Sequence, residues 1–195
     1  AWRRALKRPV LLFASAREGE EALLLEALNR KMAPALVKSK QVATKNIASE
    51  VQWLIVPRHP QRFDAVAQLC QEQGFSVSRR SHWSRGPEAA DIWLGDSLGE
   101  MALYFALSDV ALLGGSFAPL GGQNLIEATA CGCPVVMGPH TFNFAEASEL
   151  ASRAGAAFKA VDMDDAVDRC LALLQSAPAL QQARTAAHSL GRDHG

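Results

Sequence analysis

Apolar runs and amphipathic stretches alternate along the chain. Runs such as 9–14, 51–56 and 109–113 are apolar almost throughout, which is typical of strands buried on both faces of a parallel sheet. Stretches such as 20–32 instead place apolar residues at helical spacing. The alternation predicts an α/β fold in which helices cover both faces of a parallel sheet. The other expected strands are 75–78, 91–94, 134–137 and 156–161, and the other expected helices are 60–73, 100–107, 144–154, 163–175 and 178–190.

Polar motifs follow the predicted strands. They occupy the segments 15–18, 58–59, 96–100, 114–127 and 138–143, each placed after an apolar run. In parallel α/β sheets, ligands bind in a crevice at the carboxyl ends of the strands, where the strand order reverses. The candidate ligand-binding residues are therefore expected to meet at one edge of the sheet.

The stretch from Gly114 to Glu127 is the most informative of these motifs. A strand, a glycine-rich loop and a helix start at Asn124 form an anion-binding arrangement, because glycine lets the backbone approach closely and the first N–H groups of a helix are unpaired. Glu127 shares a helix face with Asn124, and a carboxylate there requires another polar partner, such as paired sugar hydroxyls. The alternative is a tight connection whose glycines serve packing alone.

Charged residues in the other loops are further candidates. Arg58 and His59 stand between prolines, and the guanidinium of Arg58 can form a fork on a phosphate or carboxylate. Arg17 is a second candidate ligand, whereas Glu20 at a helix start is expected to complement the helix dipole. His140 suits a donor or an acid. For Arg58 and His140, an ordinary surface or loop position is the alternative.

Composition indicates a globular protein that binds no nucleic acid. The 195 residues are 49% apolar and 21% charged, and no apolar run approaches the roughly 20 residues that span a bilayer. Residues 1–85 hold 15 of the 20 basic residues and 7 of the 20 acidic ones, which suits an anionic ligand or membrane surface as well as solvated faces. No basic-aromatic array for nucleic acid is present, and the four cysteines lack zinc-type spacing and look like reduced, packed thiols.

Other ligand motifs are weak or missing from the sequence. Asp162-Met-Asp164-Asp165 resembles a metal-binding Asp-x-Asp, but acids at a helix start also cap the helix and complement its dipole, which is the favoured interpretation. No Walker lysine follows the glycine loop, and no Gly-x-Gly-x-x-Gly follows the first strand. A P-loop ATPase and an NAD-binding domain are therefore disfavoured, and neither a metal nor another cofactor is expected.

Five ordered motifs together resemble one enzyme family. They are Val56-Pro-Arg-His-Pro60, Gly95-Asp-Ser-Leu-Gly-Glu100, Gly114-Gly-Ser116, Gly121-Gly-Gln-Asn-Leu-Ile-Glu127 and Gly138-Pro-His-Thr-Phe-Asn-Phe144. Over about residues 9–161 the chain is similar to the carboxy-terminal half of the bacterial 3-deoxy-D-manno-octulosonic acid (Kdo) transferases. The resemblance implies a two-domain GT-B glycosyltransferase. Residues 9–195 would be its Rossmann-like, donor-binding domain, and residues 1–8 a linker or helix end from an amino-terminal domain.

The resemblance also implies substrates and contacts. The donor would be CMP-Kdo and the acceptor the lipid A precursor of lipopolysaccharide, with inversion and without a metal. The general base would lie in the amino-terminal domain, so this chain alone would bind CMP or CMP-Kdo weakly and transfer nothing. The full-length protein would work at the cytoplasmic face of the inner membrane, whereas this fragment would be soluble. The positions implied to contact CMP are Arg58, His59, Leu98, Gly99, Glu100, Gly121, Gly122, Gln123, Asn124 and Glu127, and the candidates for the sugar are Arg17, Ser116, His140 and Asn143.

Two positions depart from the family pattern. Ala16-Arg17 stands in place of Thr-His, and Gln123 replaces the histidine of Gly-Gly-His-Asn. Gln123 forms hydrogen bonds but cannot titrate, and Arg17 adds positive charge where the sugar carboxylate would lie. Two alternatives remain. One is a GT-B enzyme that uses a UDP-sugar, either a transferase or an epimerase, and the other is a non-catalytic ligand-binding domain.

Overall fold

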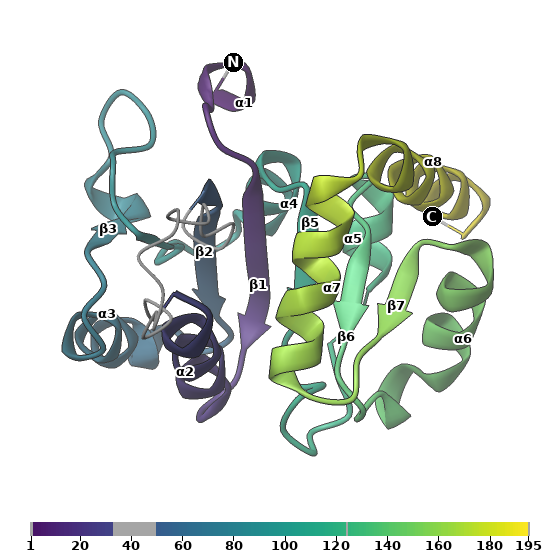
Figure 1. The fold of residues 1–195 in the computed structure, drawn as a ribbon, viewed down its shortest axis with the longest axis horizontal. Coiled ribbons are helices and arrows are strands. Elements are labelled where there is room, and N and C mark those ends of the chain that lie inside the picture. The colour runs from purple at the N-terminus through teal and green to yellow at the C-terminus, as the bar shows by residue number, and fades with distance from the viewer. Residues whose placement is uncertain (1, 33–49, 124, 195) are drawn as a thin grey trace, which may run out of the picture.

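Seven parallel strands form one sheet in the computed structural model, which describes residues 2–32, 50–123 and 125–194 (Figure 1). The strands are β1 (Val10–Ala16), β2 (Gln52–Pro57), β3 (Val77–Arg79), β4 (Ile92–Leu94), β5 (Val110–Leu113), β6 (Val135–Met137) and β7 (Ala157–Lys159). Their order across the sheet is β3-β4-β2-β1-β5-β6-β7. Because every neighbouring pair is parallel, the carboxyl ends of all strands share one edge.

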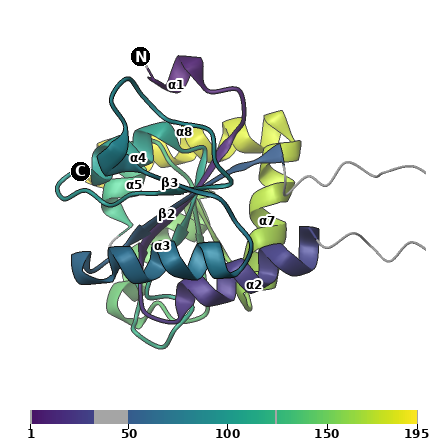
Figure 2. The same ribbon diagram turned by 90° about the vertical axis from the view of Figure 1, so that its left-hand side faces the viewer.

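Helices cover both faces of the sheet, which Figure 2 shows from the side of β3. One face carries α2 (Glu20–Met32), α3 (Phe63–Glu72) and α7 (Met163–Gln175). The other face carries α4 (Met101–Leu107), α5 (Ile126–Ala130), α6 (Ala145–Ala154) and α8 (Ala177–His194). The short elements are α1 (Trp2–Ala5) and the 3-10 turns η2 (Pro60–Arg62), η3 (Arg80–His82) and η4 (Phe142–Phe144).

Successive residues of the central strand β1 enter two different cores. Leu11 and Phe13 pack in the core beneath α2 and α7, whereas Leu12 and Ala14 join the core that contains Tyr104 of α4. Side chains of a strand alternate between faces, so a strand covered on both sides needs apolar residues at every position. The predicted parallel sheet with helices on both faces is therefore confirmed.

The boundaries of two short strands differ from the prediction. The strand expected at 156–161 is β7 at Ala157–Lys159. The strand expected at 75–78 is β3 at Val77–Arg79. Ser76, just before β3, donates its N–H to Asp91 Oδ2 at 2.9 Å, and its hydroxyl accepts from the Asp91 N–H at 2.8 Å. These two hydrogen bonds join Ser76 and Asp91 just before the residues at which β3 and β4 begin to pair.

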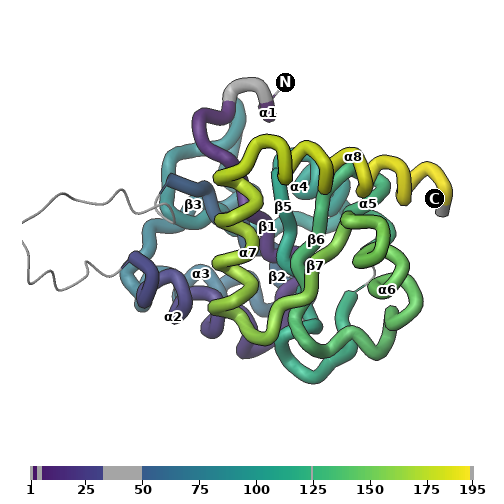
Figure 3. Tube along the Cα trace, turned by 45° about the vertical axis from the view of Figure 1, so that its right-hand side comes forward, coloured from purple at the N-terminus to yellow at the C-terminus, as the bar shows by residue number. Residues whose placement is uncertain are grey.

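The last helix, α8, runs across the molecule from α7 toward α5 (Figure 3). Gly191 permits its close approach to α5, because a Cβ at this position would stand 2.7 Å from the carbonyl oxygen of Thr129. None of the helices in the described ranges, α8 with its 18 residues included, is long and apolar enough to cross a membrane.

The strand order reverses between β1 and β5. The chain passes from β1 outward to β2, β3 and β4, and then returns to the opposite side of β1 as β5. The connections that follow β1 and β5 lead to helices on opposite faces, which leaves a crevice at the carboxyl ends of these strands. The arrowheads in Figure 1 place this edge at the bottom of the view.

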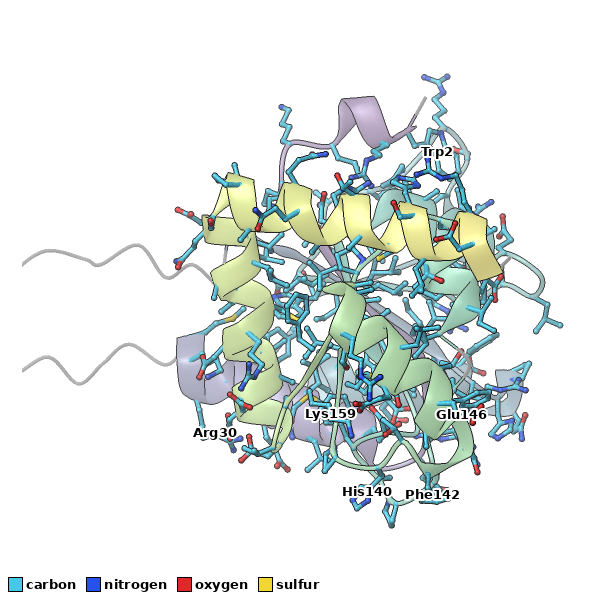
Figure 4. The ribbon with its side chains drawn as sticks, turned by 90° about the vertical axis from the view of Figure 1, so that its right-hand side faces the viewer. Trp2, Arg30, His140, Phe142, Glu146 and Lys159 are labelled. Carbon is cyan, nitrogen blue, oxygen red and sulfur yellow. The ribbon has the colours of Figure 1, made fainter. Side chains whose placement is uncertain are left out.

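The described part of the segment 1–8 packs at the other end of the molecule. The ring of Trp2 lies edge-on to that of Trp83, with centroids 6.0 Å apart, and Arg3 pairs with Asp109 at 2.9 Å. Figure 4 shows Trp2 and His140 at opposite ends of the molecule. The segment is therefore remote from the predicted ligand edge, and its role as a linker stays a prediction.

Candidate functional site

A cleft of about 330 Å³ opens at the carboxyl ends of β1, β2, β4 and β5. Three separate loops, those after β2, β4 and β5, contribute predicted CMP-binding residues to it, and the apolar side chains of Val56, Phe105 and Leu113 also line it. A larger groove of about 590 Å³ lies beside Trp2 at the opposite end, and none of the predicted ligand residues lines that groove. The predicted residues that line the cleft are Arg58, Leu98, Gly99, Gln123 and Glu127.

A bulge at the end of β1 shapes the cleft. The register between β1 and β2 shifts between Ala14 and Ala16, and the intervening Ser15 has a φ of 56°. Among the described residues it is the only non-glycine residue with a positive φ, a conformation that costs of the order of 1 kcal/mol. Ser15 lines the cleft, as expected for the segment 15–18, but the bulge itself could not be predicted, because a short run of small residues carries no sign of one.

Gly114, at the end of β5, lies against this bulge. A Cβ on Gly114 would stand 2.0 Å from the carbonyl oxygen of Ser15, so only glycine fits between the two strand ends. We expect Gly114→Ala to lower the free energy of unfolding by about 2 kcal/mol, because β1 and β5 must move apart to admit the methyl group. Urea denaturation of both proteins measures the loss.

Gly74, which follows α3, provides a matched control for Gly114→Ala. Its φ is 92° and nothing lies within 4 Å of a Cβ built on it, so Gly74→Ala introduces backbone strain without a collision. The expected loss is about 1 kcal/mol. Equal losses in the two variants would contradict the packing role assigned to Gly114.

The loop after β5 folds around the carboxylate of Glu20, the first residue of α2. Its Oε1 accepts hydrogen bonds from the N–H groups of Arg17 and Gly115, both at 2.8 Å. Its Oε2 accepts from the N–H groups of Phe117 at 3.0 Å and Ala118 at 3.1 Å. Glu20 is fully buried. The glycine loop therefore binds an anion, as the sequence predicted, but the anion is a side chain of the protein itself.

Further amides of this loop are engaged within it. The N–H of Gly122 donates to the Gly115 carbonyl at 2.9 Å, and that of Gln123 donates to the Gly114 carbonyl at 3.1 Å. Asn124, a predicted ligand, lies outside the described residues. The helix expected to start there begins at Ile126 and has five residues, so the predicted helix start is wrong. Because the two arms of the loop pair with each other, the Gly122 and Gln123 amides are not free for a phosphate.

Glu21, the next residue of α2, connects to the loop after β2. It is fully buried and pairs with both terminal guanidinium nitrogens of Arg62 in η2. Burial raises the pKa of Glu21, and Arg62 opposes that shift. In the same loop, the N–H of Arg58 donates to the Ala16 carbonyl at 2.8 Å. The side chain of Arg58 is exposed and forms no ion pair with another described residue, so its guanidinium can face an anion in the cleft.

In the turn after β4, Leu98 and Gly99 line the cleft, whereas Glu100 pairs with Arg80. Leu98 is 74% exposed and lines the cleft with Gly99, whose φ of 73° suits glycine. Glu100 lies outside the cleft lining and accepts a hydrogen bond from Arg80 at 3.1 Å. The Ser97 hydroxyl, followed by Arg80, lowers the pKa of Glu100. The carboxylate of Glu100 is thus engaged with Arg80, and a contact with a nucleotide would come from its backbone.

Ser116, predicted as a sugar contact, has a structural role. It is fully buried, and its hydroxyl donates to the Leu113 carbonyl and accepts from the Gly138 N–H at 2.9 Å. The hydroxyl joins the ends of β5 and β6. Its side chain is therefore unavailable to a sugar, and this prediction is wrong.

The other predicted residues that the structure describes do not line the cleft. Asn143 donates from Nδ2 to the Leu120 carbonyl at 3.0 Å and so holds the tip of the glycine loop. His140 projects from the ligand edge in Figure 4, and His59 precedes η2. Arg17, the residue after β1, donates its backbone N–H to Glu20. Gly121 accepts from the Asn143 N–H through its carbonyl at 3.1 Å.

The acids at the start of α7 stabilise the fold. Asp162 accepts the Asp165 N–H at 2.8 Å, Asp165 accepts from Arg169 at 3.1 Å, and Asp164 pairs with Arg30 at 2.8 Å. These are capping and surface contacts of the kind expected from the sequence. Within the parts of the chain that the structure describes, no group of three or more His, Cys, Asp or Glu residues could hold a metal ion.

The parallel sheet and the cleft at its switch point define a Rossmann-like domain of the kind from which GT-B glycosyltransferases are built. The chain superimposes on the C-terminal CMP-Kdo binding domain of WaaA from Acinetobacter baumannii with a TM-score of 0.81 and 34% identity, covering 97% of this chain and 91% of that one. It is 47% identical over 188 residues to the 3-deoxy-D-manno-octulosonic acid transferase of Bordetella pertussis. The chain belongs to the Kdo transferase family, which confirms the resemblance of the five motifs.

The relatives are longer than this chain. The match covers 96% of the chain but 41% of the Bordetella pertussis protein. The transferase of Haemophilus influenzae is 35% identical over 172 residues, which is 87% of this chain and 37% of that protein. No protein-family model matches the chain.

Proposed function

We propose that this chain is the donor-binding domain of a Kdo transferase and that its cleft holds the CMP part of CMP-Kdo. The observation that carries the proposal is the meeting of Arg58, Leu98, Gly99, Gln123 and Glu127 in one cleft at the switch point. Support comes from the Acinetobacter baumannii domain, which is named for CMP-Kdo binding and aligns over nearly the whole of this chain.

Each wall of the cleft suits one part of the nucleotide. The exposed side chain of Arg58, which forms no ion pair with another residue that the structure describes, suits the phosphate, since arginine forms paired charge-assisted hydrogen bonds with oxyanions. The exposed turn of Leu98 and Gly99 suits a flat base, with backbone groups at its edge. The exposed carboxylate of Glu127 suits the two ribose hydroxyls, and the amide of Gln123 lies on the same wall. The phosphate is assigned to Arg58 rather than to the glycine loop, whose amides hold Glu20.

For the whole protein, we propose transfer of Kdo to a lipid A precursor with inversion. A base in the amino-terminal part, which residues 1–8 would join to this domain, takes the proton of an acceptor hydroxyl. The hydroxyl oxygen then forms a bond to the anomeric carbon as the bond to the phosphate oxygen breaks. CMP leaves with the electron pair, and Arg58 stabilises its charge without a metal. The acceptor and a site at the cytoplasmic face of the inner membrane belong to this same proposal.

Titration calorimetry of the chain with CMP tests the donor site. We expect binding at millimolar CMP or below and weaker binding of UMP, because the turn after β4 would contact the exocyclic group that distinguishes the two bases. Binding of UMP or UDP in preference to CMP would indicate a GT-B domain for a UDP-sugar. The absence of heat with each nucleotide would indicate a domain without a nucleotide donor.

A further inference from the structure

Glu20 is buried between the loops that follow β1 and β5, yet it does not line the cleft. Its carboxylate accepts four backbone N–H hydrogen bonds, one from Arg17 and three from the glycine loop. An acid that only complements a helix dipole requires no more than a place in the first turn, where it can remain exposed. Four charge-assisted bonds to one buried carboxylate indicate a specific task.

The hydrogen bonds continue from Glu20 to the wall of the cleft. Glu20 holds the N–H of Gly115, and the carbonyl of Gly115 accepts the Gly122 N–H at 2.9 Å. The neighbouring carbonyl of Gly114 accepts the Gln123 N–H at 3.1 Å. The carboxylate therefore orders the first part of the loop, residues 114–118. Those residues in turn hold Gly122 and Gln123 in the second part, and Gln123 lines the cleft.

We propose that Glu20 is a positioning residue for the nucleotide donor. Its carboxylate fills the anion-binding loop and holds Gln123, and with it Glu127 a short distance further along the chain, in the arrangement that receives CMP. The proposal rests on the proposed function of the cleft. It adds that the amides of the glycine loop bind the Glu20 carboxylate and do not bind the phosphate. The loop then affects the donor by holding Gln123 in place.

Charge and geometry predict opposite effects for Glu20→Gln. The substitution removes a negative charge close to a site for an anion, and Coulomb's law alone then predicts tighter binding of CMP. In the wild type each carboxylate oxygen accepts hydrogen bonds from two backbone N–H groups, as Oε2 does from Phe117 and Ala118. The NH₂ group of glutamine would replace one of these oxygens and would face two N–H groups without being able to accept from them. Two buried donors would lose their acceptor and the loop would shift, so the positioning role predicts weaker binding.

The experiment is calorimetric titration of CMP into the wild type, Glu20→Gln and Glu18→Gln, at a temperature where thermal unfolding shows each protein fully folded. Glu18 is exposed in the same loop, so its variant removes a nearby charge without disturbing these hydrogen bonds. We expect the Kd of Glu20→Gln to rise at least about tenfold. The Kd of Glu18→Gln should stay unchanged or fall slightly.

Glu20→Asp provides a second variant. It keeps the charge but is one methylene shorter, so it cannot reach all four donors, and we expect it to weaken CMP binding as well. It decides the question if Glu20→Gln does not fold. Wild-type affinity in either folded Glu20 variant would overturn the positioning role and leave the donor site in place. Failure of the wild type itself to bind CMP would overturn the proposed function and the positioning role together.

Discussion

Replacing Arg58 with alanine is expected to weaken CMP binding about 100-fold, or roughly 3 kcal/mol. Arg58 lies in the cleft, its side chain is exposed, and it forms no ion pair with another described residue. The glycine loop offers little to the phosphate, because Glu20 and the loop itself occupy its amides. We therefore expect the phosphate to depend mainly on the guanidinium of Arg58. Titration calorimetry with CMP, beside a thermal unfolding curve, measures the effect.

Two further variants make this prediction specific. Arg85→Ala removes an exposed arginine beside the groove at the opposite end of the molecule, so CMP binding should not change. Arg58→Lys should recover part of the affinity, because lysine keeps the charge but lacks the planar fork. The free energy of unfolding of Arg58→Ala should stay within about 0.5 kcal/mol of the wild type, as for other surface changes. If folded Arg58→Ala bound CMP as tightly as the wild type, the phosphate contact could not be assigned to Arg58.

Glu127→Ala is expected to weaken CMP binding about 30-fold, or roughly 2 kcal/mol. Glu127 stands at the start of α5 with its carboxylate exposed in the cleft, and a carboxylate can accept hydrogen bonds from both ribose hydroxyls. The wild type should therefore bind CMP more tightly than dCMP, which lacks one hydroxyl. The variant should bind the two nucleotides almost equally. Parallel titrations with CMP and dCMP measure this loss of discrimination.

Glu146→Ala is the control for this variant. Glu146 is an exposed acid of the neighbouring helix α6, labelled in Figure 4, and it does not line the cleft. Its removal changes the net charge equally, so its CMP affinity separates a long-range charge effect from a contact. If Glu127→Ala kept the full preference for CMP over dCMP, the ribose contact would have to be assigned to another residue.

The sequence correctly predicts that the glycine loop binds an anion, but it does not reveal that the anion is a side chain of the protein. Its sequence predicts a backbone that binds an anion, and four amides do converge on a carboxylate. That carboxylate belongs to Glu20, whose place at a helix start had a sufficient local explanation in the helix dipole. Glu20 and Gly115 are 95 positions apart, and no local pattern in the sequence reveals that they meet.

The architecture, the family and most of the polar lining of the candidate cleft could be predicted from the sequence alone. Apolar runs of strand length between helical stretches are sufficient for a parallel sheet covered on both faces, because burial on two sides excludes polar residues from the strands. Five predicted residues, four in loops after those strands and Glu127 at the start of α5, meet in one cleft, since parallel strands bring their carboxyl ends to one edge.

How the loops at this edge use their polar groups could not be predicted from the sequence. The bulge at Ser15 lies against the end of β5, the Ser116 hydroxyl joins the ends of β5 and β6, and the carboxylate of Glu20 lies inside the glycine loop. Each of these features depends on contacts between segments that are distant in the sequence. A backbone N–H carries the same donor in every residue except proline, so the sequence cannot say which acceptor it will find. That choice is made when distant segments pack together, and here it directs the loop amides to Glu20 and leaves Arg58 to face the cleft.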